Sequence, residues 1–232
     1  MAEEKTRKEL LEEPDPFMAF IDKARDFIKK YQQYIVTITL AVFILAVVVS
    51  GWIYFKRQAE NKASFMLGNA LASLNAITQT NSLQKTPSVA EYESVRKKFK
   101  EIIDAFGSTG AGKAALLNYA DLSYLTKNYD EAIKTYQKAL EVFGDQPEFK
   151  NLILNGLAYS YEGKKDMDNA IKYFNMIASD DNAIMKDQAL YNLGRIYAEL
   201  GKKDKEIEAY KQIVKKYPDS MYFQLAKEKI AG

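Results

Sequence analysis

The sequence predicts an all-α protein with one membrane-spanning helix near its N-terminus, followed by a solenoid of helical hairpins. Two observations lead to this fold class. Residues 34–55 form an uncharged apolar run, and three later segments repeat a pattern of two amphipathic helices joined by a short polar turn. The 232 residues are 47% hydrophobic and 28% charged, which is ordinary for packed domains. Because the apolar residues are so unevenly distributed, the two parts of the chain are expected to occupy different solvents.

The N-terminal segment divides into a tail and an amphipathic helix. Residues 1–14 are charged and poor in apolar side chains, so we expect them to be disordered. Residues 15–33 predict a helix lying along the membrane interface, with Asp15 as its N-cap and Pro16 in its first turn. Its apolar residues recur every three or four positions: Phe17, Phe20, Ile21, Ala24, Phe27, Ile28 and Tyr31. A helix that binds a partner protein is the alternative.

The run at 34–55 predicts the transmembrane helix, because it would be roughly 33 Å long, which is enough to cross the hydrocarbon core. Aromatic side chains stand at both ends, and Lys56 and Arg57 end the run. A cleaved signal peptide is the main alternative, but the run is longer than a secretory apolar region and no small-x-small cleavage pattern follows. More Lys and Arg precede the span than follow it, which predicts a cytoplasmic N-terminus and a translocated C-terminal domain.

Residues 56–232 predict the repeat domain, with units near 113–147, 151–183 and 187–218. Ala132 and Ala170 are 38 residues apart, and Ala170 and Glu206 are 36 apart. Small and aromatic residues recur in this register: Ala120, Ala158 and Gly194 in first helices, and Tyr136, Phe174 and Tyr210 in second helices. The pattern resembles the tetratricopeptide repeat and predicts a tetratricopeptide-like α-solenoid. Residues 59–106 are expected to form a degenerate first unit, and 219–231 a capping helix.

Composition argues against an enzyme, because the chain contains neither Cys nor His. It therefore lacks the thiol nucleophile, the general base that titrates near neutral pH and the commonest metal ligands. We therefore expect no catalytic residues, no cofactor and no metal. The stretch GSTGAGK at 107–113 matches the start of a phosphate-binding loop, but a helical pattern precedes it and Ala114 follows the lysine. Asp166 and Asp168 suggest part of a calcium loop, although Asp168 is more simply explained as a helix cap. The 33 basic and 31 acidic residues form no long stripe, which argues against nucleic-acid binding.

Function is therefore expected to reside in a protein-binding surface. First helices line the concave side of such solenoids. The residues expected there are Asp121, Tyr124, Asn155, Tyr159, Glu162, Tyr191 and Arg195. Tyrosine, asparagine and arginine suit the recognition of a peptide or helix. The alternative for each residue is that it completes the packing between helices.

The whole plan resembles the YfgM family, most specifically in the segment FIKKYQQYIVTITLAVFILAVVVSGWIYFKRQAENKASFMLGNAL. Members of that family are ancillary proteins of the bacterial inner membrane, associated with the Sec translocon and with a membrane-anchored periplasmic prolyl-isomerase chaperone. The resemblance implies a single-pass inner-membrane adaptor with periplasmic repeats that helps pass newly secreted polypeptides to chaperones. A scaffold for another envelope or organelle membrane complex is the alternative, and neither reading requires chemistry.

Overall fold

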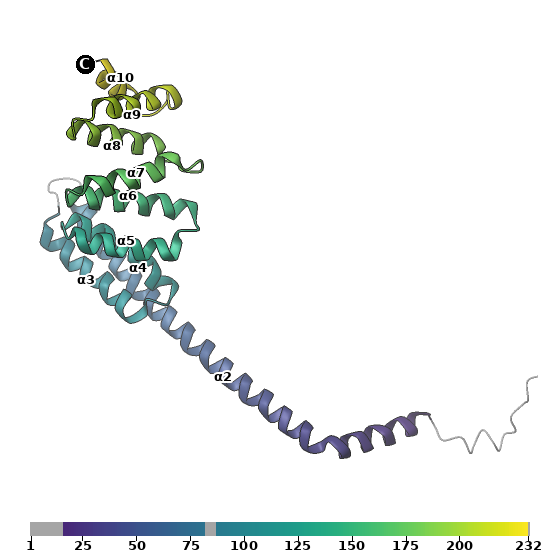
Figure 1. Ribbon diagram of the computed structural model, residues 1–232. Coiled ribbons are helices and arrows are strands. Elements are labelled where there is room, and N and C mark those ends of the chain that lie inside the picture. The colour runs from purple at the N-terminus through teal and green to yellow at the C-terminus, as the bar shows by residue number, and fades with distance from the viewer. Residues whose placement is uncertain (1–15, 82–86, 232) are drawn as a thin grey trace, which may run out of the picture. The chain divides into compact units, whose positions relative to one another are not determined.

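The structure is a computed structural model that describes residues 16–81 and 87–231 (Figure 1). The described residues contain helices and no strand, which confirms the predicted all-α class. The chain divides between Arg57 and Gln58 into two units. The helices are α2 (Pro16–Asn81), α3 (Val89–Phe106), α4 (Gly110–Leu125), α5 (Tyr129–Phe143), α6 (Pro147–Gly163), α7 (Met167–Ser179), α8 (Lys186–Glu199), α9 (Lys203–Lys216) and α10 (Phe223–Ala231).

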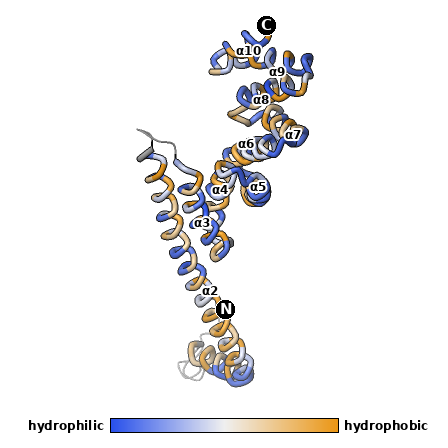
Figure 2. The backbone as a smooth tube through the Cα atoms, turned by 90° about the vertical axis from the view of Figure 1, so that its left-hand side faces the viewer, coloured by the Kyte–Doolittle hydropathy of each residue, from blue (hydrophilic) through white to orange (hydrophobic). Residues whose placement is uncertain are grey.

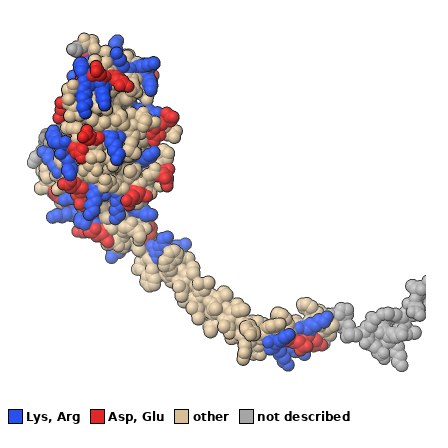
Figure 3. Space-filling view, in the orientation of Figure 1, with Lys and Arg blue, Asp and Glu red and all other residues tan. Residues whose placement is uncertain are grey.

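The first unit consists of the N-terminal part of α2, the one described helix that is long and apolar enough to cross a membrane. Every residue from 34 to 50 is exposed, and most of these side chains are apolar. Its charged side chains lie before and after the apolar stretch, which is orange in Figure 2 and free of red and blue in Figure 3. The expected tail and the expected cap at Asp15 lie outside the described residues.

The second unit is a stack of helical hairpins, in which α4 pairs with α5, α6 with α7, and α8 with α9 (Figure 1). Their apolar faces meet because each helix repeats its buried residues every three or four positions. Ala120 and Ala158 are fully buried, as are Ala132 and Ala170 on the facing helices. These small side chains allow the paired backbones to approach closely.

Aromatic side chains fill the space that the small residues leave. A Cβ atom added at Gly194 would lie 2.5 Å from the ring of Tyr210, and one added at Gly156 would lie 2.3 Å from the ring of Tyr136. Tyr136, Phe174 and Tyr210 are all buried at equivalent positions of the three second helices. The structure therefore shows the physical reason for the spacing of 36 and 38 residues.

The turns inside the three hairpins share one backbone geometry. Lys127, Lys165 and Gly201 have φ of 62°, 66° and 67°, the left-handed conformation. In each turn the N–H of the next residue donates to a carbonyl five residues earlier, as Asn128 does to Ser123 at 2.8 Å. This pattern is the Schellman motif, which satisfies carbonyls at a helix end. Glycine occupies the left-handed position in the third hairpin only, where it indicates the turn in the sequence. Lysine occupies the same position in the other two hairpins and gives no such indication.

In the later repeats one helix cap differs from expectation, and one position departs from the repeat pattern as the sequence indicates. Asp166 rather than Asp168 caps α7, because its Oδ1 accepts the backbone N–H of Asn169 at 3.2 Å, while Asp168 lies inside the first turn. Glu206 replaces the small residue of earlier repeats and is buried, and its carboxylate pairs with Lys203 at 3.3 Å. A buried carboxylate needs such a partner to offset the loss of solvation.

Glu60 connects the part of α2 in the second unit to the beginning of α4. Its carboxylate oxygens accept the backbone N–H groups of Gly110 at 2.7 Å and Ala111 at 2.9 Å. The first N–H groups of a helix have no partner within the helix, and the helix dipole favours a negative charge there. Thr109 caps the same end by accepting the N–H of Gly112 at 2.9 Å. Three consecutive N–H groups of the phosphate-loop-like stretch, those of Gly110, Ala111 and Gly112, are thus bound by the chain's own side chains.

Replacing Glu60 with Ala is expected to lower the free energy of unfolding of the second unit by about 1.5–3 kcal/mol, the usual range for hydrogen bonds to a charged group. Gln should retain one acceptor oxygen and cost less. Urea unfolding of the full-length chain, followed by circular dichroism, measures both changes. A stability equal to that of the parent chain for Glu60→Ala would show that this contact contributes nothing.

Candidate protein-binding face

The seven predicted site residues come from α4, α6 and α8, the first helices of the three hairpins. We call the surface they form the first-helix face. Helix α6 carries Asn155, Tyr159 and Glu162 three and four positions apart, which places them on one side of the helix. The same reasoning groups Asp121 with Tyr124 on α4, and Tyr191 with Arg195 on α8. Helices α4 and α6 also contact each other directly.

Tyr159 lies at the centre of the contacts within this face. Its ring centroid is 6.3 Å from that of Tyr124 and 5.3 Å from that of the buried Phe174, with an edge-to-face geometry in the second pair. Its hydroxyl accepts hydrogen bonds from Asn192 at 2.9 Å and Gln188 at 3.3 Å. Tyr159 is therefore fixed by three helices and is part of the packing as well as of the surface.

Glu162 and Arg195 form a bidentate ion pair between α6 and α8. Both guanidinium Nη atoms lie 2.7 Å from the carboxylate oxygens. The hydrogen bond to Glu162 raises the pKa of Arg195, and the planar pairing holds both side chains in one orientation. The two residues thus present a neutral, preorganised pair rather than a free positive charge.

Asp121 interacts with the second helix of its own hairpin. The Tyr136 hydroxyl donates to Asp121 Oδ1. Desolvation raises the pKa of Asp121, and the hydrogen bond from Tyr136 offsets part of that rise. The cause is that the neighbouring helices displace part of the water around this carboxylate, although Asp121 as a whole is exposed, and lost hydration disfavours the charged form.

Asp121→Asn is expected to raise the free energy of unfolding at neutral pH and to remove the part of its pH dependence that comes from Asp121. Because the pKa of Asp121 is raised in the folded state, its contribution to stability is greatest below the ordinary aspartate pKa of about 3.9 and is lost as the pH rises through the folded value. Asn keeps an acceptor for Tyr136 without the charge. Urea unfolding at neutral and acidic pH tests this, and a variant less stable than the parent at neutral pH would contradict it.

Asn155 and Tyr191 complete the predicted set in different ways. Tyr191 stacks on Tyr222, with ring centroids 4.7 Å apart, so the segment before α10 covers one side of it. Asn155 is partly exposed and makes no hydrogen bond with any described residue. Beside it on α6, Leu152 is 44% exposed. Asn155 and Leu152 are thus the side chains of α6 on this face that are available to a ligand.

Sequence reasoning missed Gln188, Asn192 and Tyr222. Gln188 and Asn192 could have been found, because they lie seven and three positions before Arg195 on the same side of α8. Tyr222 follows the last repeat, where the repeat register gives no guidance. Among the described residues no group of three acidic, histidine or cysteine side chains could hold a metal ion.

The arrangement suits binding rather than catalysis. It combines fixed aromatic rings, a neutralised ion pair, a free amide and an exposed leucine, which are the components of peptide-recognition surfaces. The sequence model of a family described as a tetratricopeptide repeat-like domain matches residues 25–231. No curated protein matches the chain.

Proposed function

Since the chain belongs to the tetratricopeptide repeat-like domain family, we propose that it is a membrane-anchored adaptor that binds other proteins through its first-helix face. The observation that carries this proposal is the combination of a rigid Tyr159, Glu162 and Arg195 network with the unpartnered amide of Asn155. A free amide beside fixed rings can pair with the backbone of a bound polypeptide at little entropic cost.

The proposed anchor is residues 34–55, with 15–33 along the interface. The support is that all side chains from 34 to 50 are exposed and uncharged. Apolar surface of this extent is stable only in lipid or against another protein, because each buried aliphatic or aromatic side chain gains about 1.5–3 kcal/mol. A helix of this length also satisfies its own backbone groups in lipid.

The resemblance to the YfgM family supports a more specific proposal. The chain would lie in the bacterial inner membrane with its N-terminus in the cytoplasm and its repeats in the periplasm. Its partners would be translocon subunits, a membrane-anchored prolyl-isomerase chaperone and newly secreted polypeptides. Anchoring would raise the local concentration of the repeats near these partners, so modest affinity would suffice.

Topology is tested with the natural absence of cysteine. Thr6→Cys and Ser108→Cys, in separate chains, are exposed to an impermeant maleimide on intact cells. Ser108 is exposed in the turn before α4, so a cysteine there is accessible to the reagent. Labelling at 108 and not at 6 supports periplasmic repeats, and the reverse pattern rejects the translocon proposal.

The binding face is tested by photocrosslinking from position 152 in the full-length chain, with a benzoylphenylalanine in place of Leu152. The same group at Lys172, an exposed residue of the second helix α7, is the matched control. We expect position 152 to capture translocon subunits, the isomerase or secreted chains, and Asn155→Ala to weaken this capture. Capture of another complex from position 152 would favour the scaffold function, and equal capture from both positions would reject the first-helix face.

A further inference from the structure

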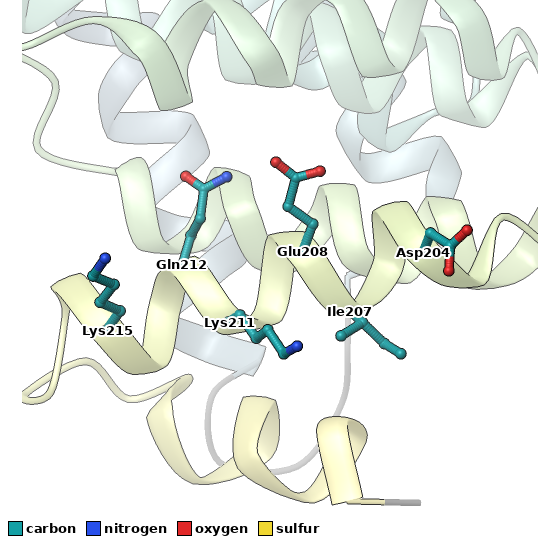
Figure 4. A pocket seen from close by; sticks show the side chains of 6 residues that line it. All are labelled: Asp204, Ile207, Glu208, Lys211, Gln212 and Lys215. Carbon is teal, nitrogen blue, oxygen red and sulfur yellow. The ribbon is translucent and has the colours of Figure 1, made fainter.

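Helix α9 carries a stripe of six side chains around a shallow hollow on its outer surface: Asp204, Ile207, Glu208, Lys211, Gln212 and Lys215. We call these residues the α9 stripe. In Figure 4, Glu208 and Gln212 point to one side of the helix axis, Ile207 and Lys211 to the other, and Asp204 and Lys215 lie towards the two ends. The four charged members are exposed and make no ion pair with any described residue.

The charges of the α9 stripe are mirrored about its midpoint, which lies between Ala209 and Tyr210. Asp204 is as far from the midpoint as Lys215, and Glu208 is as far from it as Lys211. When two identical helices run antiparallel around a two-fold axis, residues equally far from the midpoint reach the same level of the interface. Every acidic residue of one copy would then stand beside a basic residue of the other.

Stability of the helix itself explains only part of this order. The helix dipole favours Asp204 in the first turn and Lys215 in the last. Glu208 and Lys211, three residues apart, attract each other within one helix, but the like-charged pairs Asp204–Glu208 and Lys211–Lys215, four residues apart, are unfavourable there. The segregation of charge thus gains little within one helix, whereas it favours pairing between copies.

The equivalent helices of the other hairpins lack the pattern. The matching positions are Asp130, Lys134, Gln137 and Glu141 on α5, and Asp168, Lys172, Asn175 and Ser179 on α7. Two copies of α5 arranged in the same way would place Asp130 against Glu141, both acidic. The mirrored pattern is therefore a feature of α9 and not of the repeat.

We infer that the α9 stripe binds the α9 stripe of a second copy of this chain in an antiparallel two-fold dimer. Four ion pairs form, two of each kind, around Ile207 and Gln212 of both copies. Each pair is weak at an exposed surface, so the dimer weakens with salt and depends on a high local concentration. The membrane anchor of the proposed function supplies that concentration, whereas the dimer uses the α9 stripe and leaves the first-helix face free.

The test uses full-length chains in liposomes, labelled through Ser108→Cys with donor or acceptor dyes. Asp204→Lys with Glu208→Lys gives a basic stripe, and Lys211→Glu with Lys215→Glu gives an acidic stripe. We expect energy transfer for the parent chain, its loss for basic with basic and for acidic with acidic, and its recovery when basic and acidic chains are mixed. High salt should reduce the transfer in the mixture.

Glu101→Lys with Glu141→Lys is the matched control. It changes the net charge by the same amount as the basic stripe, but at exposed positions outside α9. It should keep the energy transfer of the parent chain. Transfer at the parent level between two acidic chains, or no recovery in the mixture, would overturn the inference. Failure of the chains to remain in liposomes would instead reject the anchor, so the two failures are distinguishable.

Discussion

Replacing Phe174 with Ala is expected to lower the free energy of unfolding of the repeat unit by about 3–5 kcal/mol, the usual cost of removing a buried phenylalanine ring. Phe174 is 0% exposed and belongs to a core cluster that includes Ala158, Leu193 and Tyr210. The neighbouring helices are held by other contacts, so they cannot close the cavity completely. The loss therefore includes a cavity contribution as well as the lost burial.

Urea unfolding of the full-length chain in detergent, followed by circular dichroism, measures this loss. Phe65→Ala is the matched control, because Phe65 lies in the same unit and is 71% exposed. It should change stability by no more than about 0.5 kcal/mol. Since Phe174 supports the ring of Tyr159, its replacement should also weaken capture from the first-helix face. Equal losses for the two phenylalanines would contradict the assigned core.

Replacing Ile44 and Val48 together with Arg is expected to release the chain from membranes. Each arginine at the centre of a span costs about 2.5–3.5 kcal/mol on insertion scales. The two positions are four residues apart and so lie on one side of the helix, where neither side chain has a partner among the described residues. Both residues are otherwise exposed members of the apolar run.

Carbonate extraction of membranes measures this second effect, with Ile44→Leu and Val48→Leu as the control that preserves apolar surface. The control should stay in the pellet and the arginine variant should appear in the soluble fraction or be degraded. Retention of the arginine variant as an integral protein would mean that residues 34–55 are not the anchor.

The hairpins could be predicted because their signals are local. Ala120 and Ala158, for example, recur in a register that any helical hairpin of this kind needs, and the structure buries both completely. The contact between Glu60 and the start of α4 could not be predicted. Its partners lie 50 and 51 residues away, and in the sequence Glu60 resembles any exposed charge of a helix.

The positions of the candidate site residues could be predicted from the sequence. The hydrogen bonds and ion pair that join them could not. Their spacing predicts that Tyr159 and Arg195 lie on a surface, yet each is fixed by a residue 33 positions away, Asn192 and Glu162 respectively. Such pairs depend on how neighbouring hairpins pack. The substitution Arg195→Ala would therefore leave the carboxylate of Glu162 without its partner, which makes Asn155 the cleaner probe of binding.

The stacking of each helix on its neighbours in the chain also has consequences for how the protein reaches its fold. From α3 to α10 the contacts join helices that are adjacent or nearly adjacent in sequence. Proteins with such short-range contacts fold rapidly, because little chain entropy is lost before a contact forms. A chain that emerges with its N-terminus first can therefore fold vectorially, since each new helix meets a partner that is already in place. Folding of this domain need not wait for the end of synthesis.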